Sequence, residues 1–89
     1  MLPETDLNII ISCAKKYNVS AVYLFGSSLN EGAQPRDLDL GVKGLQPQLF
    51  FKFYGELLRY LSKDVDLVDL SKKSLFNDLV EERGIRIYG

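Results

Sequence analysis

The chain has 89 residues, of which 46% are hydrophobic and 26% charged, so we expect one globular domain, residues 1–89, with a single core. The net charge of −1 argues against sequence-independent binding to nucleic acid, which needs a basic face, but not against binding a nucleotide. The single cysteine, Cys13, excludes an internal disulfide, fits a reducing cytoplasm and has no histidine to activate it. No apolar run approaches the roughly 20 residues of a membrane span, and the N-terminal segment lacks the basic start of a secretion signal.

The spacing of apolar residues predicts alternating helices and strands. Thr5 and either Ser71 or Ser74 are candidate helix N-caps, and Pro47 suits a first helical turn. Asn18 suits the left-handed residue that ends a helix. In chain order, we expect a helix over residues 4–17, a strand over 20–25, a loop over 27–36, a strand over 37–42, a helix over 46–62, a strand over 64–70, a helix that ends at Gly84, and a short edge strand over 85–88.

This order, α-β-β-α-β-α-β, predicts a small α/β domain whose mixed sheet has about four strands flanked by helices. The last helix has an apolar stripe made of Leu75, Phe76, Leu79 and Val80.

Two aspartates one residue apart, Asp37 and Asp39, lie in a run that alternates polar and apolar residues. Both therefore project from one face of the predicted strand, while Leu38 and Leu40 enter the core. Adjacent carboxylates repel each other and resist ionising together unless a cation lies between them. Because the chain has no histidine and one cysteine, the donor set favours magnesium over zinc. A solvent-exposed strand face is the alternative interpretation.

A third carboxylate is expected from the strand over residues 64–70. Asp64 and Asp66 share one face of that strand, and Val65 and Leu67 share the other. If this strand pairs beside the second strand, Asp66 stands next to the aspartate pair. Asp64 takes its place if the register differs by two residues.

Gly26 and Ser27 form a turn at the end of the strand over residues 20–25. Only glycine lets backbone N–H groups approach a phosphate closely, and the serine hydroxyl adds a donor. We expect the turn to face the aspartates across a cleft, although a plain turn role is the alternative. Among the basic residues, Arg36 is the best candidate for a phosphate contact because it flanks the aspartate pair.

The run GSSLNEGAQPRDLDLGV, followed later by VDLVDL, resembles the minimal nucleotidyltransferases of the DNA polymerase beta superfamily over nearly the whole chain. By this resemblance, Gly26 and Ser27 match the phosphate-binding turn, and Asp37, Asp39 and Asp66 match the catalytic, metal-binding carboxylates. The resemblance implies that the protein transfers a nucleoside monophosphate to a hydroxyl group and uses two Mg²⁺ ions to do so. The nucleotide that it implies is ATP, which donates AMP.

Many small members of this family are antitoxins encoded beside a helical HEPN ribonuclease toxin, and some silence the toxin by adenylylating a tyrosine. The resemblance therefore implies a HEPN-type protein partner in a homo- or hetero-oligomer. Two features depart from the family: Arg36 stands where a serine is usual, and the loop from Gly26 to Asp37 is one residue shorter. The alternative function is an inactive relative, an antitoxin that acts only by binding its partner.

The predicted helix over residues 46–62 carries two apolar stripes. The core stripe consists of Phe50, Phe53, Leu57 and Leu61. The second stripe consists of Phe51, Tyr54 and Leu58. It is either the edge of a broad core-facing side or a contact surface for a partner, since large exposed apolar patches are uncommon on soluble monomers.

Overall fold

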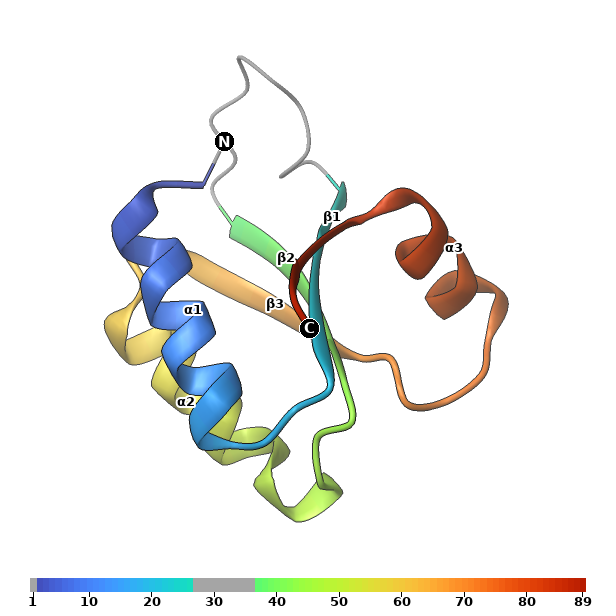
Figure 1. The fold of residues 1–89 in the computed structure, drawn as a ribbon, viewed down its shortest axis with the longest axis horizontal. Helices are drawn as coiled ribbons and strands as arrows, with labels where there is room; N and C mark the ends of the chain where they lie inside the picture. The colour runs from blue at the N-terminus through green and yellow to red at the C-terminus, as the bar shows by residue number, and fades with distance from the viewer. Residues whose placement is uncertain (1, 27–36) are drawn as a thin grey trace.

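The computed structural model describes residues 2–26 and 37–89 and shows a twisted sheet with helices on both of its faces (Figure 1). In chain order, the elements are α1 (Glu4–Lys16), β1 (Ala21–Phe25), β2 (Asp37–Lys43), the 3₁₀ helix η2 (Pro47–Leu49), α2 (Phe50–Tyr60), β3 (Asp64–Asp69), α3 (Leu75–Arg83) and β4 (Ile85–Tyr88). This order confirms the predicted α/β class. Within the described ranges, no helix is long and apolar enough to cross a membrane.

The sheet is mixed, as predicted, with the strand order β3-β2-β1-β4. β1 pairs antiparallel with both β2 and β4, whereas β2 pairs parallel with β3. A parallel pair needs a crossover connection, which η2 and α2 provide. The strand that carries the third aspartate therefore lies directly beside the strand that carries the first two.

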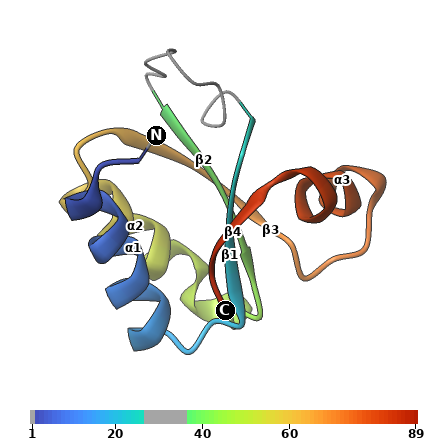
Figure 2. The same cartoon turned by 45° about the horizontal axis from the view of Figure 1, so that its top comes forward.

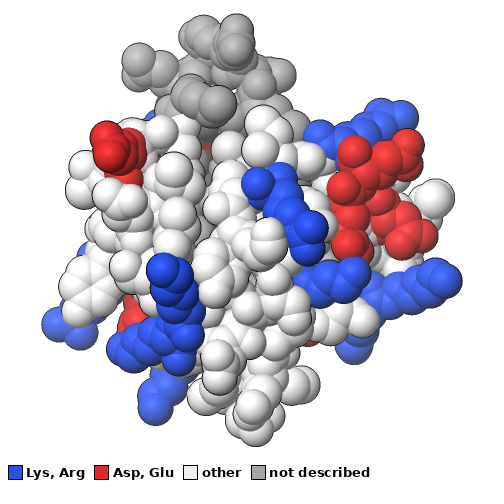
Figure 3. All heavy atoms as spheres, in the orientation of Figure 1, with Lys and Arg blue, Asp and Glu red and all other residues white. Residues whose placement is uncertain are grey.

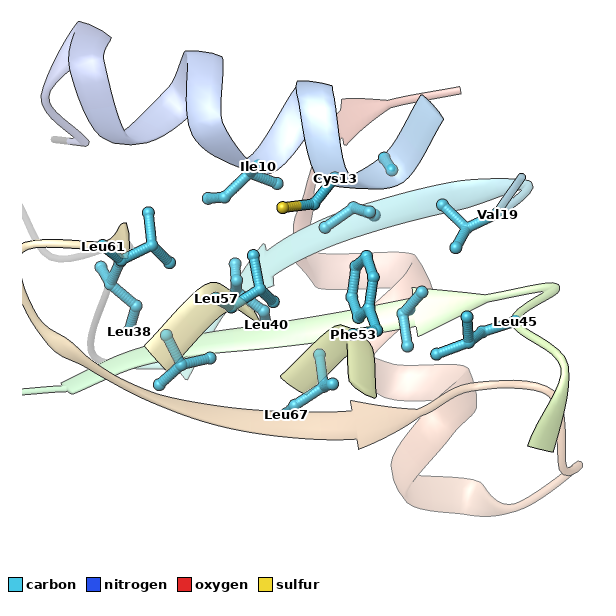
Figure 4. Packing of buried hydrophobic residues seen from close by; sticks show 14 of the residues in the cluster. Ile10, Cys13, Val19, Leu38, Leu40, Leu45, Phe53, Leu57, Leu61 and Leu67 are labelled. Carbon is cyan, nitrogen blue, oxygen red and sulfur yellow. The ribbon is translucent and has the colours of Figure 1, made fainter. Parts of the chain in front are cut away.

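The two faces of the sheet are covered differently. Figure 2 shows α1 and α2 side by side on one face and α3 on the other. The main core lies between the helix pair and the sheet (Figure 4). Its largest fully buried side chains are Phe53, Ile10, Leu40, Leu57, Val22 and Val42. The opposite face has a smaller buried cluster, made of Ala21, Tyr23, Leu70 and Val80.

The structure corrects the predicted N-cap of α1 and shows which of two candidate serines is the N-cap of α3. The N-cap of α1 is Pro3, whose fixed φ of −59° sets the helix entry, so Thr5 is already inside the first turn. Asn18 has the predicted left-handed conformation, with φ of 57°. Of the two serines considered for α3, Ser74 is the N-cap, because its hydroxyl oxygen accepts the backbone N–H of Asn77 at 3.0 Å.

The apolar stripe predicted for α3 is mostly not a core stripe. Only Val80 is buried, whereas Leu75, Phe76 and Leu79 are exposed. The helix is held from its polar side instead, because the buried Asn77 side chain donates to two backbone carbonyls of the β3–α3 turn, at 3.2 and 2.6 Å. The periodicity correctly predicted that α3 has an apolar side. Of the four residues on that side, however, only Val80 is buried against the sheet.

A buried carboxylate joins α1 to the end of α2. Asp6 is only 3% exposed, and its two oxygens accept the backbone N–H of Ser62 at 3.2 Å and the hydroxyl of Ser62 at 2.6 Å. Both donors of Ser62 are satisfied by this one side chain.

We expect Asp6→Ala to destabilise the fold by about 1–3 kcal/mol, because partly buried donors lose their acceptor. Thermal denaturation should show a Tm that is lower by about 4–8 °C for each kcal/mol. Glu4→Ala is the matched control, since Glu4 is also acidic and in the first turn of α1 but exposed. Equal Tm values for the two variants would contradict the assigned role of Asp6.

Candidate active site

The three predicted carboxylates lie on one patch of the sheet face that α1 and α2 do not cover. In register, Asp39 of β2 pairs with Phe25 of β1 on one side and with Asp66 of β3 on the other. Because neighbouring strands lie about 4.8 Å apart, this register sets Asp39 and Asp66 side by side. Asp37 lies two residues earlier on β2 and projects from the same face.

The alternation predicted for both strands is present. On β2, Asp37 is exposed and Asp39 half-buried, while the intervening Leu38 is buried. On β3, Asp64 and Asp66 are both exposed. Asp64 pairs with Asp37, one row further from the β1 turn than Asp66, so both candidates for the third carboxylate stand on the open face.

The turn after β1 packs directly against this patch. Gly26 has φ of +66°, and a Cβ atom at this position would lie 2.5 Å from Oδ2 and 3.2 Å from Cγ of Asp39. The left-handed conformation favours glycine, and a side chain here would in addition have to displace the Asp39 carboxylate. The glycine turn therefore contacts the strand that carries Asp37 and Asp39. Ser27 and Arg36 lie outside the described residues, so their roles stay predictions.

The donor set fits a divalent cation, because carboxylate oxygens are the ligands that Mg²⁺ prefers. The described residues nevertheless contain no group of three His, Cys, Asp or Glu side chains gathered closely enough to hold a metal ion. Mg²⁺ at such sites is commonly held by one or two carboxylates together with substrate phosphates, which does not require a preformed cluster.

An apolar pocket of about 200 Å³ opens beside the turn, between the end of β1 and α3. Its lining consists of Phe25, Gly26, Phe76, Leu79, Val80, Arg83 and Gly84. The rings of Phe25 and Phe76 pack edge to face, with centroids 5.8 Å apart. The sequence analysis identified the apolar stripe of α3 but did not predict this pocket, because the pocket forms only where α3 packs beside the end of β1.

Two basic residues, Lys43 and Arg59, lie away from the aspartates. Lys43, at the opposite end of β2, pairs with Glu81 at 2.8 Å, and this hydrogen bond raises the pKa of Lys43. Arg59 is on α2, on the other side of the sheet, where its guanidinium lies 5.7 Å from the centroid of the Tyr60 ring. On the face shown in Figure 3, Lys and Arg form separate groups rather than one continuous band, and Asp and Glu gather where α3 lies.

A larger pocket, of about 520 Å³, lies between α1 and α2 and is separated from the aspartates by the sheet. Lys16 and Glu56 form an ion pair at its wall, with Nζ and Oε1 2.5 Å apart. Burial and the nearby Glu56 carboxylate raise the pKa of the Cys13 thiol, so the thiol stays protonated and unreactive near neutral pH. This pocket lacks the groups that phosphoryl transfer needs, and Cys13 has the structural environment that its sequence context predicted.

The comparisons with known proteins agree with this geometry. The model of the family described as polymerase beta, nucleotidyltransferase matches residues 8–89. Among solved structures, a chain of a toxin–antitoxin complex with AMP-PNP matches with a TM-score of 0.75 and 27% identity, over 93% of this chain and 73% of that one. A chain of the MntA–HepT toxin–antitoxin complex matches with a TM-score of 0.72 and 25% identity, over 98% of this chain and 73% of that one.

A third match is a chain of the complex of tri-AMPylated Shewanella oneidensis HEPN toxin with MNT antitoxin, with a TM-score of 0.71 and 27% identity, over 94% of this chain and 70% of that one. No curated protein matches the chain.

We expect Gly26→Ala to lower the Tm, because a left-handed residue with a Cβ costs about 1–2 kcal/mol before the clash with Asp39 is counted. Gly55→Ala is the matched control. Gly55 lies within α2, a Cβ there would meet nothing within 4 Å, and alanine favours a helix, so this variant should raise the Tm. A Tm for Gly26→Ala at or above the wild-type value, measured by thermal denaturation, would contradict the preference for glycine at this turn.

Proposed function

The chain belongs to the polymerase beta nucleotidyltransferase family, and on this premise we propose that it is a magnesium-dependent enzyme that transfers AMP from ATP to a hydroxyl of a partner protein. The partner we propose is a HEPN toxin, which makes the chain an antitoxin.

One observation carries the proposal: Gly26 lies against Asp39, and Asp39 lies in register beside Asp66. A phosphate-binding turn must lie within reach of the carboxylates that hold the cation, because the same phosphate oxygens contact both. A left-handed glycine that lies against the Asp39 carboxylate supports this requirement better than a plain turn would.

The proposed roles follow from position. Gly26 and Ser27 donate backbone and hydroxyl hydrogen bonds to the triphosphate, and Asp37 and Asp39 hold the cation on the nucleotide side. Asp66 completes the site on the acceptor side, because β3 lies at the edge of the sheet. Magnesium, when bound, neutralises phosphate charge and lowers the pKa of the attacking hydroxyl.

The acceptor has one direction of approach. α1 and α2 close one face of the sheet, while the half of the other face that carries the aspartates is exposed. The hydroxyl oxygen then attacks the α-phosphorus in line, the bond to the bridging oxygen breaks, and pyrophosphate leaves. This open geometry suits an acceptor on the surface of a folded protein.

The structural neighbours support a protein acceptor. One matched complex contains AMP-PNP, and another contains a HEPN toxin that carries AMP groups. A second candidate function is an antitoxin without catalytic activity, and the exposed Phe51 and Leu58 favour it as well, since occlusion requires only a contact surface.

Incubation with labelled ATP, Mg²⁺ and a candidate HEPN protein distinguishes the two functions. The enzyme should leave a covalent label on the HEPN protein, whereas an occluding antitoxin should form a tight, unlabelled complex. EDTA should abolish labelling, and added Mg²⁺ should restore it.

We expect the double variant Asp37→Asn, Asp39→Asn to lose transfer by at least about a hundredfold, since the ligands of the cation are removed. Its Tm should stay the same or rise, because repulsion between carboxylates is relieved. Glu82→Gln is the matched control, because Glu82 is an exposed acid on α3. Full labelling by the double variant would refute the assigned site.

A further inference from the structure

An exposed apolar stripe lies on the side of α2 that faces away from α1. Phe51 is 83% exposed and Leu58 is 46% exposed. Tyr54, which the sequence grouped with them, turns to the sheet and donates its hydroxyl to the carbonyl of Val65 at 2.6 Å. Of the three residues in the second stripe, Tyr54 packs against the core, whereas Phe51 and Leu58 face solvent.

Gly55 lies between these two side chains. It follows Phe51 by four residues and precedes Leu58 by three, so all three share one side of the helix. Glycine is the least favourable helix residue after proline, yet a Cβ at position 55 would meet nothing within 4 Å. Among the described residues, no packing contact explains this glycine. It leaves a gap, called the hollow below, in the row of side chains between Phe51 and Leu58.

Positive charge borders the hollow. Lys52 and Arg59 are both exposed and lie three residues before and four residues after Gly55. The acidic residue of α2, Glu56, is held on the other side of the helix by Lys16 of α1, which lowers the pKa of Glu56. The stripe therefore combines two exposed apolar side chains, the hollow and a basic border.

We propose that this α2 surface, made of Phe51, Gly55 and Leu58 and bordered by Lys52 and Arg59, binds an amphipathic helix of the partner protein. A ridge of the partner helix enters the hollow at Gly55, where the absent side chain allows the two backbones to approach closely. Acidic side chains of the partner face Lys52 and Arg59. The inference rests on the proposed function only for the existence of a protein partner.

A second copy of this chain fits the surface less well. Two α2 helices crossing at Gly55 would bring Lys52 and Arg59 of one copy close to the same cations of the other, and like charges at an interface are unfavourable. Two large side chains also bury less surface than the roughly 800 Å² that each partner buries in a typical stable interface. We therefore expect Phe51 and Leu58 to be the central anchor of a larger interface. Because α2 lies across the sheet from the aspartates, the partner can bind here while the open face stays accessible.

The test uses isothermal titration calorimetry to measure binding of the full chain to the HEPN protein that it labels or with which it forms a complex. We expect Phe51→Ser and Leu58→Ser each to raise the Kd at least about tenfold, because they truncate anchor residues. Leu75→Ser is the matched control, since Leu75 is 78% exposed but lies on α3. It should leave the Kd within about twofold, and all three variants should keep the wild-type Tm because the side chains are exposed.

Two further variants separate binding from folding. Gly55→Ala should raise the Tm by about 4–8 °C while weakening the complex, a combination that a purely structural glycine would not give. Replacing Lys52 and Arg59 by Glu should weaken the complex most at low salt, whereas the same change at the exposed Lys72 and Lys73 should not.

Four outcomes overturn the inference: no complex with the HEPN protein, equal weakening by Leu75→Ser, an unchanged Kd for the Phe51 and Leu58 variants, or self-association of the chain that these variants abolish. The last outcome assigns the surface to a second copy. The variant with Asp37 and Asp39 replaced by Asn should bind normally, so a tight complex that remains unlabelled contradicts the proposed enzyme without contradicting the docking surface.

Discussion

The parallel pairing of β2 with β3 is the constraint on which the rest of the structure depends. The same register that aligns Asp39 with Asp66 on the open face aligns Leu38 with Val65 and Leu40 with Leu67 in the core. Placing like charges side by side is unfavourable by itself. The buried apolar pairs on the reverse side fix the register nonetheless, since a slip by one residue would turn both the aspartates and the core side chains to the wrong face. Core packing thereby maintains an arrangement that electrostatics alone would oppose.

The parallel pair also determines how the two faces of the molecule are used. Its crossover brings α2 onto one face next to α1, where the largest buried side chains gather. The other face is covered only in part by α3, so Asp37 and Asp66 are exposed, Asp39 is half-buried, and an apolar pocket lies beside Gly26. One face is thus available for nucleotide and acceptor, while the outer side of α2 is available for a stable protein contact. Binding and transfer need not compete for the same surface.

Patterns within single strands predicted most of the candidate site. Strict alternation in β2 and β3 indicated which side chains enter the core, and the structure confirms it at Leu38, Leu40, Val65 and Leu67. Patterns on helices were less informative, because an apolar stripe shows that a helix has an apolar side but not how much of that side another element covers. Most of the α3 stripe and two residues of the second α2 stripe are therefore exposed. Asp6 and Asn77 carried no sequence signal, since their roles depend on donors and acceptors that are distant in the chain or in an irregular turn.

The order of helices and strands, the face of each acidic side chain and the family resemblance could all be predicted from the amino-acid sequence, because they depend on local periodicity and on short motifs. Only the tertiary structure decided that β3 lies beside β2, that Gly26 contacts Asp39, and that Phe51, Gly55 and Leu58 remain uncovered. The physical reason is that strand neighbours and helix coverage result from packing between segments far apart in the chain, and no local pattern of residues specifies which segments meet.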